Sequence, residues 1–87
     1  PNPFSRKTQF TFELTNDADI TVDIYTLAGR LIKSIHTQNY TLGYHRIAWD
    51  GRDEYGSLLA NGVYLYKMTA EKGTQKIKHF GRLAIYR

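Results

Sequence analysis

The stretch LLANGVYLYKMTA, residues 58–70, decides the fold class. Asn61-Gly62 is a strong signal for a tight turn, because both residue types tolerate the positive φ angles that such turns require. Val63 to Ala70 then carries apolar side chains on both faces, which is typical of a central strand. Tyr64 opens this strand just after the turn, as in a tyrosine corner, where the hydroxyl bonds main chain a few residues upstream. The stretch predicts an all-β sandwich.

The rest of the chain alternates between apolar and polar residues from one turn signal to the next. Strands are expected over residues 8–14, 20–24, 31–35, 44–49 and 76–86, and a turn over 39–43. Gly81 interrupts the last of these strands and is expected to mark a bulge. No segment longer than a turn shows a helical period. Short strands with turns roughly every 8–12 residues predict an immunoglobulin-like antiparallel β-sandwich of about seven strands.

Length and composition predict one domain over residues 1–87. The chain opens on Pro1-Asn2-Pro3 without a signal peptide, so we expect a C-terminal domain excised from a larger exported protein. Cysteine is absent, which excludes a disulfide framework and a thiolate metal site. No apolar run approaches the roughly 18 residues of a membrane-spanning helix.

Positive charge gathers toward the end of the chain. Residues 1–29 hold two cationic side chains against four carboxylates, whereas residues 61–87 hold six cationic side chains against Glu71 alone. A basic end can attract an acidic partner, but the simpler interpretation is a solvated strand face.

The sequence does not favour a calcium site, a hydrolytic triad or a phosphate-binding loop. Asp50, Asp53 and Glu54 offer oxygen ligands for calcium, but the EF-hand spacing is absent and Arg52 lies inside the cluster, which favours a structural turn. His36, His45 and His79 are isolated, and no serine lies in a nucleophile-elbow context. The glycines lack a phosphate-binding spacing. We therefore expect no enzyme and no catalytic, cofactor-binding or metal-binding residue.

Aromatic residues leave two binding alternatives. Tyr64 and Tyr66 beside lysines could stack nucleic-acid bases, but their alternation indicates core packing, so no nucleic-acid partner is expected. Tyr40, Tyr44 and Tyr55 are expected in loops and are the candidates for binding carbohydrate. Trp49 is expected in the core, packed with Phe10 or Phe12 and Tyr64.

Five stretches together resemble a known family. Pro1-Asn2-Pro3-Phe4, the Gly62-to-Tyr66 strand and the Arg82-to-Arg87 end resemble motifs of the type A C-terminal sorting domains of type IX secretion. The Ile24-to-Arg30 hairpin and the loop from Trp49 to Gly56 are similar to segments of the same domains. The tryptophan loop also resembles the immunoglobulin-like domain of the flagellar hook-capping protein and the sorting domain of the secretion system's own gingipain-like sortase.

The resemblance implies a non-catalytic sorting module. Such domains direct their parent protein through the periplasm and across the outer membrane, where a sortase usually removes them and attaches the cargo to the cell surface. Partners would be translocon, shuttle or sortase proteins, and the isolated domain would be a monomer.

Specific residues follow from this resemblance. Recognition is expected in the last strand, and processing beside Pro1, Asn2 and Pro3. The expected recognition residues are Gly81, Arg82, Leu83, Ile85 and Arg87, with Lys76 and Lys78 as weaker candidates. The expected structural residues are Trp49, Asp50, Gly51, Gly62 and Tyr64. The alternatives are a structural or interaction module of a hook-cap-like or extracellular scaffold protein, and a carbohydrate-binding sandwich.

Overall fold

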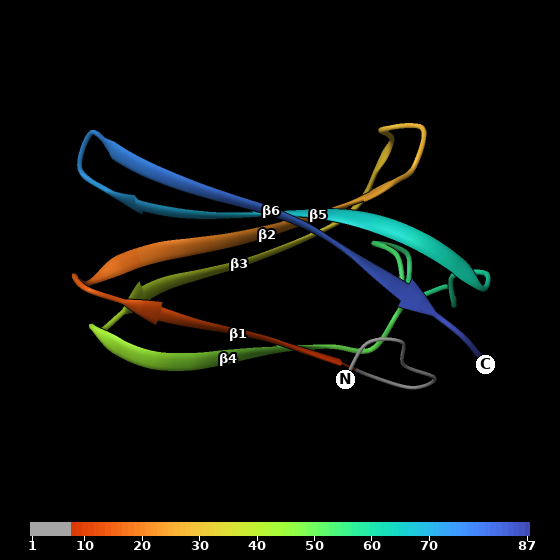
Figure 1. The fold of residues 1–87 in the computed structure, drawn as a ribbon, viewed down its shortest axis with the longest axis horizontal. Helices are drawn as coiled ribbons and strands as arrows, with labels where there is room; N and C mark the ends of the chain where they lie inside the picture. The colour runs from red at the N-terminus through yellow and green to blue at the C-terminus, as the bar shows by residue number, and fades with distance from the viewer. Residues whose placement is uncertain (1–7) are drawn as a thin grey trace.

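A computed structural model describes residues 8–87, so the expected processing residues Pro1, Asn2 and Pro3 lie outside the described part. Its order of elements is β1 (Thr8–Leu14), β2 (Ala18–Thr26), β3 (Leu31–Tyr40), β4 (Gly43–Trp49), β5 (Gly62–Lys72) and β6 (Gln75–Ile85). All pairings are antiparallel. Figure 1 shows two layers, with β1 and β4 below and the other four strands above.

The immunoglobulin-like antiparallel sandwich is confirmed, but its two sheets are unequal. One sheet has the order β3-β2-β5-β6, and the other contains β1 and β4. Within residues 8–87 the strands therefore number six, one fewer than the sequence suggested. β5 lies between β2 and β6, so it is an interior strand of its sheet, as its sequence indicated.

The core lies where the inner faces of the two sheets meet. Alternation places Ile20, Val22 and Ile24 of β2 on that face, and all three are fully buried. Trp49 is 3% exposed and joins Phe10 and Tyr64 in the same cluster, while Phe12 packs against it. The sequence-based expectation for Trp49 is confirmed.

β3 is longer than its sequence suggested. It continues past Ile35 to Tyr40, so the turn expected over residues 39–43 shrinks to Thr41 and Leu42. A register shift in β2 between Ala18 and Ile20 accommodates Asn39, whose φ is 62°. Two carboxylates accept hydrogen bonds from main-chain amides in this region. Asp19 accepts from the Asn39 amide and Asp17 from the Leu42 amide, each at 2.9 Å.

The bulge expected at Gly81 is absent. β5 and β6 pair without a register shift from Gly62 opposite Ile85 to Lys72 opposite Gln75. Gly81 lies opposite Tyr66, and a Cβ atom at Gly81 would come within 2.5 Å of the Tyr66 ring. The glycine is therefore explained by close packing across the strand pair.

Candidate functional site

β6, the strand on which the sequence concentrates recognition, is an edge strand. Its one neighbour among the described strands is β5. The strand carries Lys76, Lys78 and Arg82 and no carboxylate. Because alternate side chains of a strand point to opposite faces, the expected recognition residues divide into two groups.

One group faces the interior. Leu83 and Ile85 are 4% and 2% exposed and belong to the core. Gly81 shares their face and accommodates the Tyr66 ring. A partner cannot touch Leu83 or Ile85 on the folded domain, so these two residues support recognition only by holding the strand in place.

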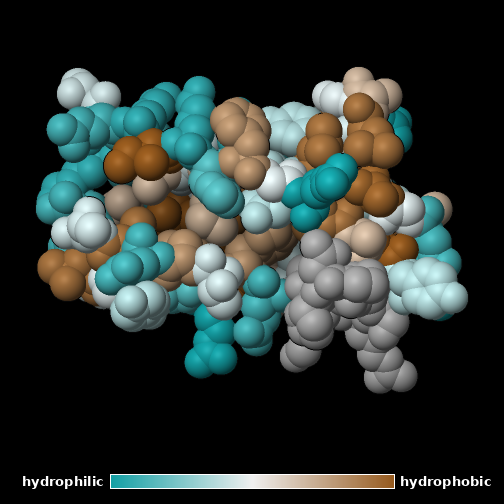
Figure 2. Space-filling view, viewed as in Figure 1, coloured by the Kyte–Doolittle hydropathy of each residue, from teal (hydrophilic) through white to brown (hydrophobic). Residues whose placement is uncertain are grey.

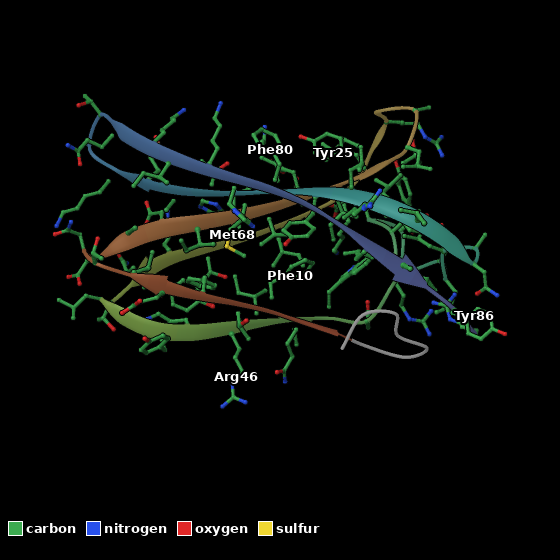
Figure 3. All side chains as sticks on the ribbon, in the orientation of Figure 1. Phe10, Tyr25, Arg46, Met68, Phe80 and Tyr86 are labelled. Carbon is green, nitrogen blue, oxygen red and sulfur yellow. The ribbon has the colours of Figure 1, made fainter. Side chains whose placement is uncertain are left out.

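The other group lies on the outer face. Lys76 is 3.9 Å from the Glu71 carboxylate, and Lys78 and Arg82 are exposed two and six residues further along. Phe80 lies between them and points away from the second sheet in Figure 3, with 68% of its surface exposed. Phe80 could not be singled out from the sequence, because its place in an alternating pattern does not reveal which face of the strand is covered.

Arg87 is tied to the loop before β5. Its amide donates to the Asn61 side-chain oxygen at 3.0 Å, and the Asn61 side-chain nitrogen donates to its carbonyl at 3.3 Å. Its guanidinium also donates to the Leu59 carbonyl. These contacts give Arg87 a structural role in holding the end of the chain.

The loop after β4 is held by its own polar groups. The Trp49 indole donates to the Arg52 carbonyl at 3.0 Å, and an Asp50 oxygen accepts from the Arg52 amide at 3.2 Å. Asp53 accepts from the amides of Tyr55 and Ser57, both at 2.9 Å. The buried Gly51 adopts a φ of 78°, which favours glycine, and its carbonyl accepts from Leu59.

Glu54 fastens this loop to β3. Its amide donates to the Ile32 carbonyl, and its carboxylate accepts from the Ser34 amide at 2.8 Å. Lys33 lies 3.8 Å from the same carboxylate. The carboxylates of Asp50, Asp53 and Glu54 therefore have structural roles: they stabilise the turn and connect it to β3. No group of three or more potential metal-ligating side chains occurs within residues 8–87.

The tyrosine corner is confirmed. Tyr64 is 8% exposed, and its hydroxyl donates to the Ala60 carbonyl at 2.6 Å, four residues upstream. Gly62 opens β5 beside it. Gly62 and Tyr64 thus both contribute to the start of the central strand β5: Gly62 is its first residue, and Tyr64 bonds it to the preceding turn.

The three tyrosines considered for carbohydrate binding do not share one environment. Tyr40 ends β3 and Tyr44 lies in β4, so neither belongs to a loop as the sequence suggested. Tyr40 is partly buried, meets the Phe12 ring edge to face and lies at a tilt to the His45 ring. Tyr44 and Tyr55 are 82% and 93% exposed, but Tyr44 is the second residue of β4, whereas Tyr55 lies in the loop beyond the other end of that strand.

An open pocket of about 460 Å³ lies between the two sheets beside β1 and β6, and the sequence analysis missed it. Its apolar lining includes Phe12, Tyr66, Met68 and Ile77. In Figure 3, Phe10 and Met68 point into the space between the sheets, and in the same view Figure 2 shows apolar side chains gathered between hydrophilic margins. No helix within residues 8–87 is long and apolar enough to cross a membrane.

Comparison with known proteins gives the family. The FlgD Ig-like domain profile matches residues 2–74. This chain belongs to the FlgD Ig-like domain family. The basal-body rod modification proteins FlgD of Salmonella typhimurium and Salmonella typhi are each 33% identical to it over 67 residues. Those matches cover 76% of this chain and 29% of the relatives, so the chain spans under a third of their length.

Solved structures share the sandwich. FlgD from P. aeruginosa superposes with a TM-score of 0.77 at 18% identity, over 90% of this chain and 60% of that one. Dimeric latent PorU from Porphyromonas gingivalis gives a TM-score of 0.80 at 26% identity, over 98% of this chain and 8% of that one. FlgD from Xanthomonas campestris, whose structure concerns the hook capping essential for flagellar assembly, superposes with a TM-score of 0.70 at 21% identity, over 92% of this chain and 56% of that one.

Proposed function

We propose that this FlgD-type Ig-like domain is a non-catalytic sorting module. It would direct its parent protein through the periplasm, across the outer membrane and onto the cell surface by a type IX-type secretion system. The supporting observation concerns β6. The similarity to PorU extends over 98% of the chain, this strand included, at 26% identity, whereas the two FlgD structures superpose over 90% and 92% of the chain at 18% and 21% identity.

The recognition surface in this proposal is the outer face of β6. Lys76, Lys78 and Arg82 lie in this strand and would present positive charge to a translocon, shuttle or sortase protein. The buried Leu83 and Ile85 hold the strand against the core. Recognition therefore uses the outward residues of the basic terminal motif, and folding uses the inward ones.

A fusion experiment tests this function. The domain is joined to the C-terminus of a periplasmic reporter in a bacterium that has a type IX secretion system, and reporter on the cell surface is measured. We expect surface display with the intact domain. Absence of display would overturn the sorting function and leave the structural module of a hook-cap-like protein, which the FlgD relatives favour.

Charge reversal tests the residues. Lys78→Glu together with Arg82→Glu should reduce surface display, because both residues are exposed on β6. The matched control is Arg30→Glu with Arg46→Glu, which reverses two exposed cations away from β6. Thermal melting of all variants checks folding. Equal display by the two double variants would exclude charge recognition by these residues and leave the shape or main chain of the folded domain as the signal.

A further inference from the structure

A single amide side chain connects the turn before β5 to the segment that follows β6. Asn61 donates from Nδ2 to the Arg87 carbonyl at 3.3 Å, and its Oδ1 accepts from the Arg87 amide at 3.0 Å. Asn61 and Gly62 are both exposed. This connection therefore depends on an asparagine that is open to water and is followed directly by glycine.

An asparagine in this position can cyclise with the residue after it. When the Gly62 main-chain nitrogen gives up its proton to hydroxide, it can attack the Asn61 side-chain carbonyl carbon and close a five-membered ring, a reaction favoured because both groups belong to one chain. The bond to Nδ2 breaks, and that nitrogen leaves as ammonia after taking a proton from water. Glycine has no side chain to obstruct the attack. Water then opens the succinimide ring at either carbonyl carbon, which gives aspartate or isoaspartate.

The contact with Arg87 assists this attack. Negative charge develops on Oδ1 when the carbonyl carbon becomes tetrahedral, and the Arg87 amide already donates to this atom. A main-chain donor that is directed at such an oxygen stabilises the charge, as in an oxyanion hole. No other asparagine of the chain precedes glycine, because Asn16 and Asn39 are followed by residues that have side chains.

We propose that Asn61 deamidates spontaneously in the folded domain, and that this modification releases Arg87 from the turn. Aspartate puts a carboxylate oxygen in place of the Nδ2 donor, so two acceptors would face each other where a 3.3 Å hydrogen bond lies. Isoaspartate also adds one atom to the main chain, within the turn that the Tyr64 hydroxyl closes by its bond to the Ala60 carbonyl. Both products therefore disturb the start of β5 and the segment after β6.

The inference does not depend on the sorting function, and peptide mapping tests the reaction. The purified protein is incubated at neutral pH, and mass spectrometry follows the change from amide to acid at each asparagine. Enzymatic methylation of isoaspartate detects the second product. A synthetic peptide of residues 58–65 shows when the incubation has been long enough. Asn61 should convert faster than Asn16 and Asn39, and Asn61→Gln should stay unmodified at this position, because glutamine would have to close a larger ring.

A direct substitution tests the consequence. Asn61→Asp should lower the melting temperature by about 4–8 °C, the shift expected for the loss of one hydrogen bond in a domain of this size. Backbone NMR relaxation of Arg87 should show greater mobility in this variant, and also in the deamidated fraction of the aged parent. Gln9→Glu is the matched control, since it makes the same change from amide to acid at an exposed residue of β1, and it should shift the melting temperature less than half as much.

Three outcomes would overturn the proposal. The first is conversion of Asn61 no faster than that of Asn16 and Asn39 once the peptide has reacted. The second is an Asn61→Asp variant in which the melting temperature and the mobility of Arg87 are unchanged. The third is a more stable variant, in which the new carboxylate draws the Arg87 guanidinium from the Leu59 carbonyl and holds the segment more firmly.

Discussion

Gly81 and Arg87 show how residues of a terminal motif divide between recognition and packing. Both are among the recognition residues expected from the sequence. Gly81, however, accommodates the Tyr66 ring, and Arg87 bonds to Asn61 and Leu59. Their substitution would change stability before it changed recognition. The exposed Lys78 is therefore a better residue for testing recognition than either of them.

Gly81→Ala should lower the free energy of unfolding by about 1–3 kcal/mol, the usual cost of overpacking. The new methyl group would lie 2.5 Å from Tyr66 ring atoms, so the ring or the strand must move. Urea denaturation measures the loss. In a Tyr66→Leu background the same change should cost clearly less, since the ring is absent. Equal losses in both backgrounds would place the strain somewhere other than the Gly81–Tyr66 contact.

At the scale of elements, the loop after β4 is stabilised by contacts that reach far along the chain. Asp53 closes the loop on itself, while Glu54 joins it to Ile32 and Ser34 of β3. The loop thereby covers one end of the sandwich and holds the Arg52 carbonyl against the Trp49 indole. The acidic residues of this loop therefore help to hold the core residue Trp49 in place.

Asp53→Ala should reduce the free energy of unfolding by about 1–2 kcal/mol, because two amide donors lose their carboxylate acceptor. Asp53→Asn retains a side-chain oxygen at the same place and should lose less than half as much. Denaturant unfolding of the three proteins gives the comparison. If the asparagine variant were as unstable as the alanine variant, negative charge rather than hydrogen bonding would hold the loop.

At the scale of the whole molecule, one buried cluster joins the two sheets. Phe10, Ile47 and Trp49 come from the two-stranded sheet and meet Tyr64, Leu83 and the β2 residues of the other sheet. A domain of 87 residues has a total stability of only about 4–13 kcal/mol. A single large residue between the sheets therefore carries a substantial part of it.

Trp49→Ala should cost about 3–5 kcal/mol and leave the domain largely or wholly unfolded. Trp49 is 3% exposed, and its removal leaves a cavity between the sheets. Thermal melting followed by far-ultraviolet circular dichroism tests this. Trp49→Phe keeps an aromatic ring but loses the bond to Arg52, so it should be destabilised less. An alanine variant that melts within a few degrees of the parent would show that Trp49 contributes little to the core.

Local patterns predicted much of this structure. Alternation, turn residues and the Asn61-Gly62 signal predicted the all-β class, the burial of Trp49 and the tyrosine corner. These features depend on residues close together in the sequence, or on which face of a strand is apolar. The basic character of β6 was also predictable, because charge is a property of the residues themselves.

The sequence by itself determined which segments form strands and which side chains prefer the interior. Only the tertiary structure decided that β3 continues to Tyr40, that Gly81 packs against Tyr66, that Arg87 is fastened to Asn61, and that β1 borders an open groove. The physical reason is that each of these depends on pairing between distant segments. An alternating pattern specifies that a strand has an inner face, but the partner strands determine whether that face is covered.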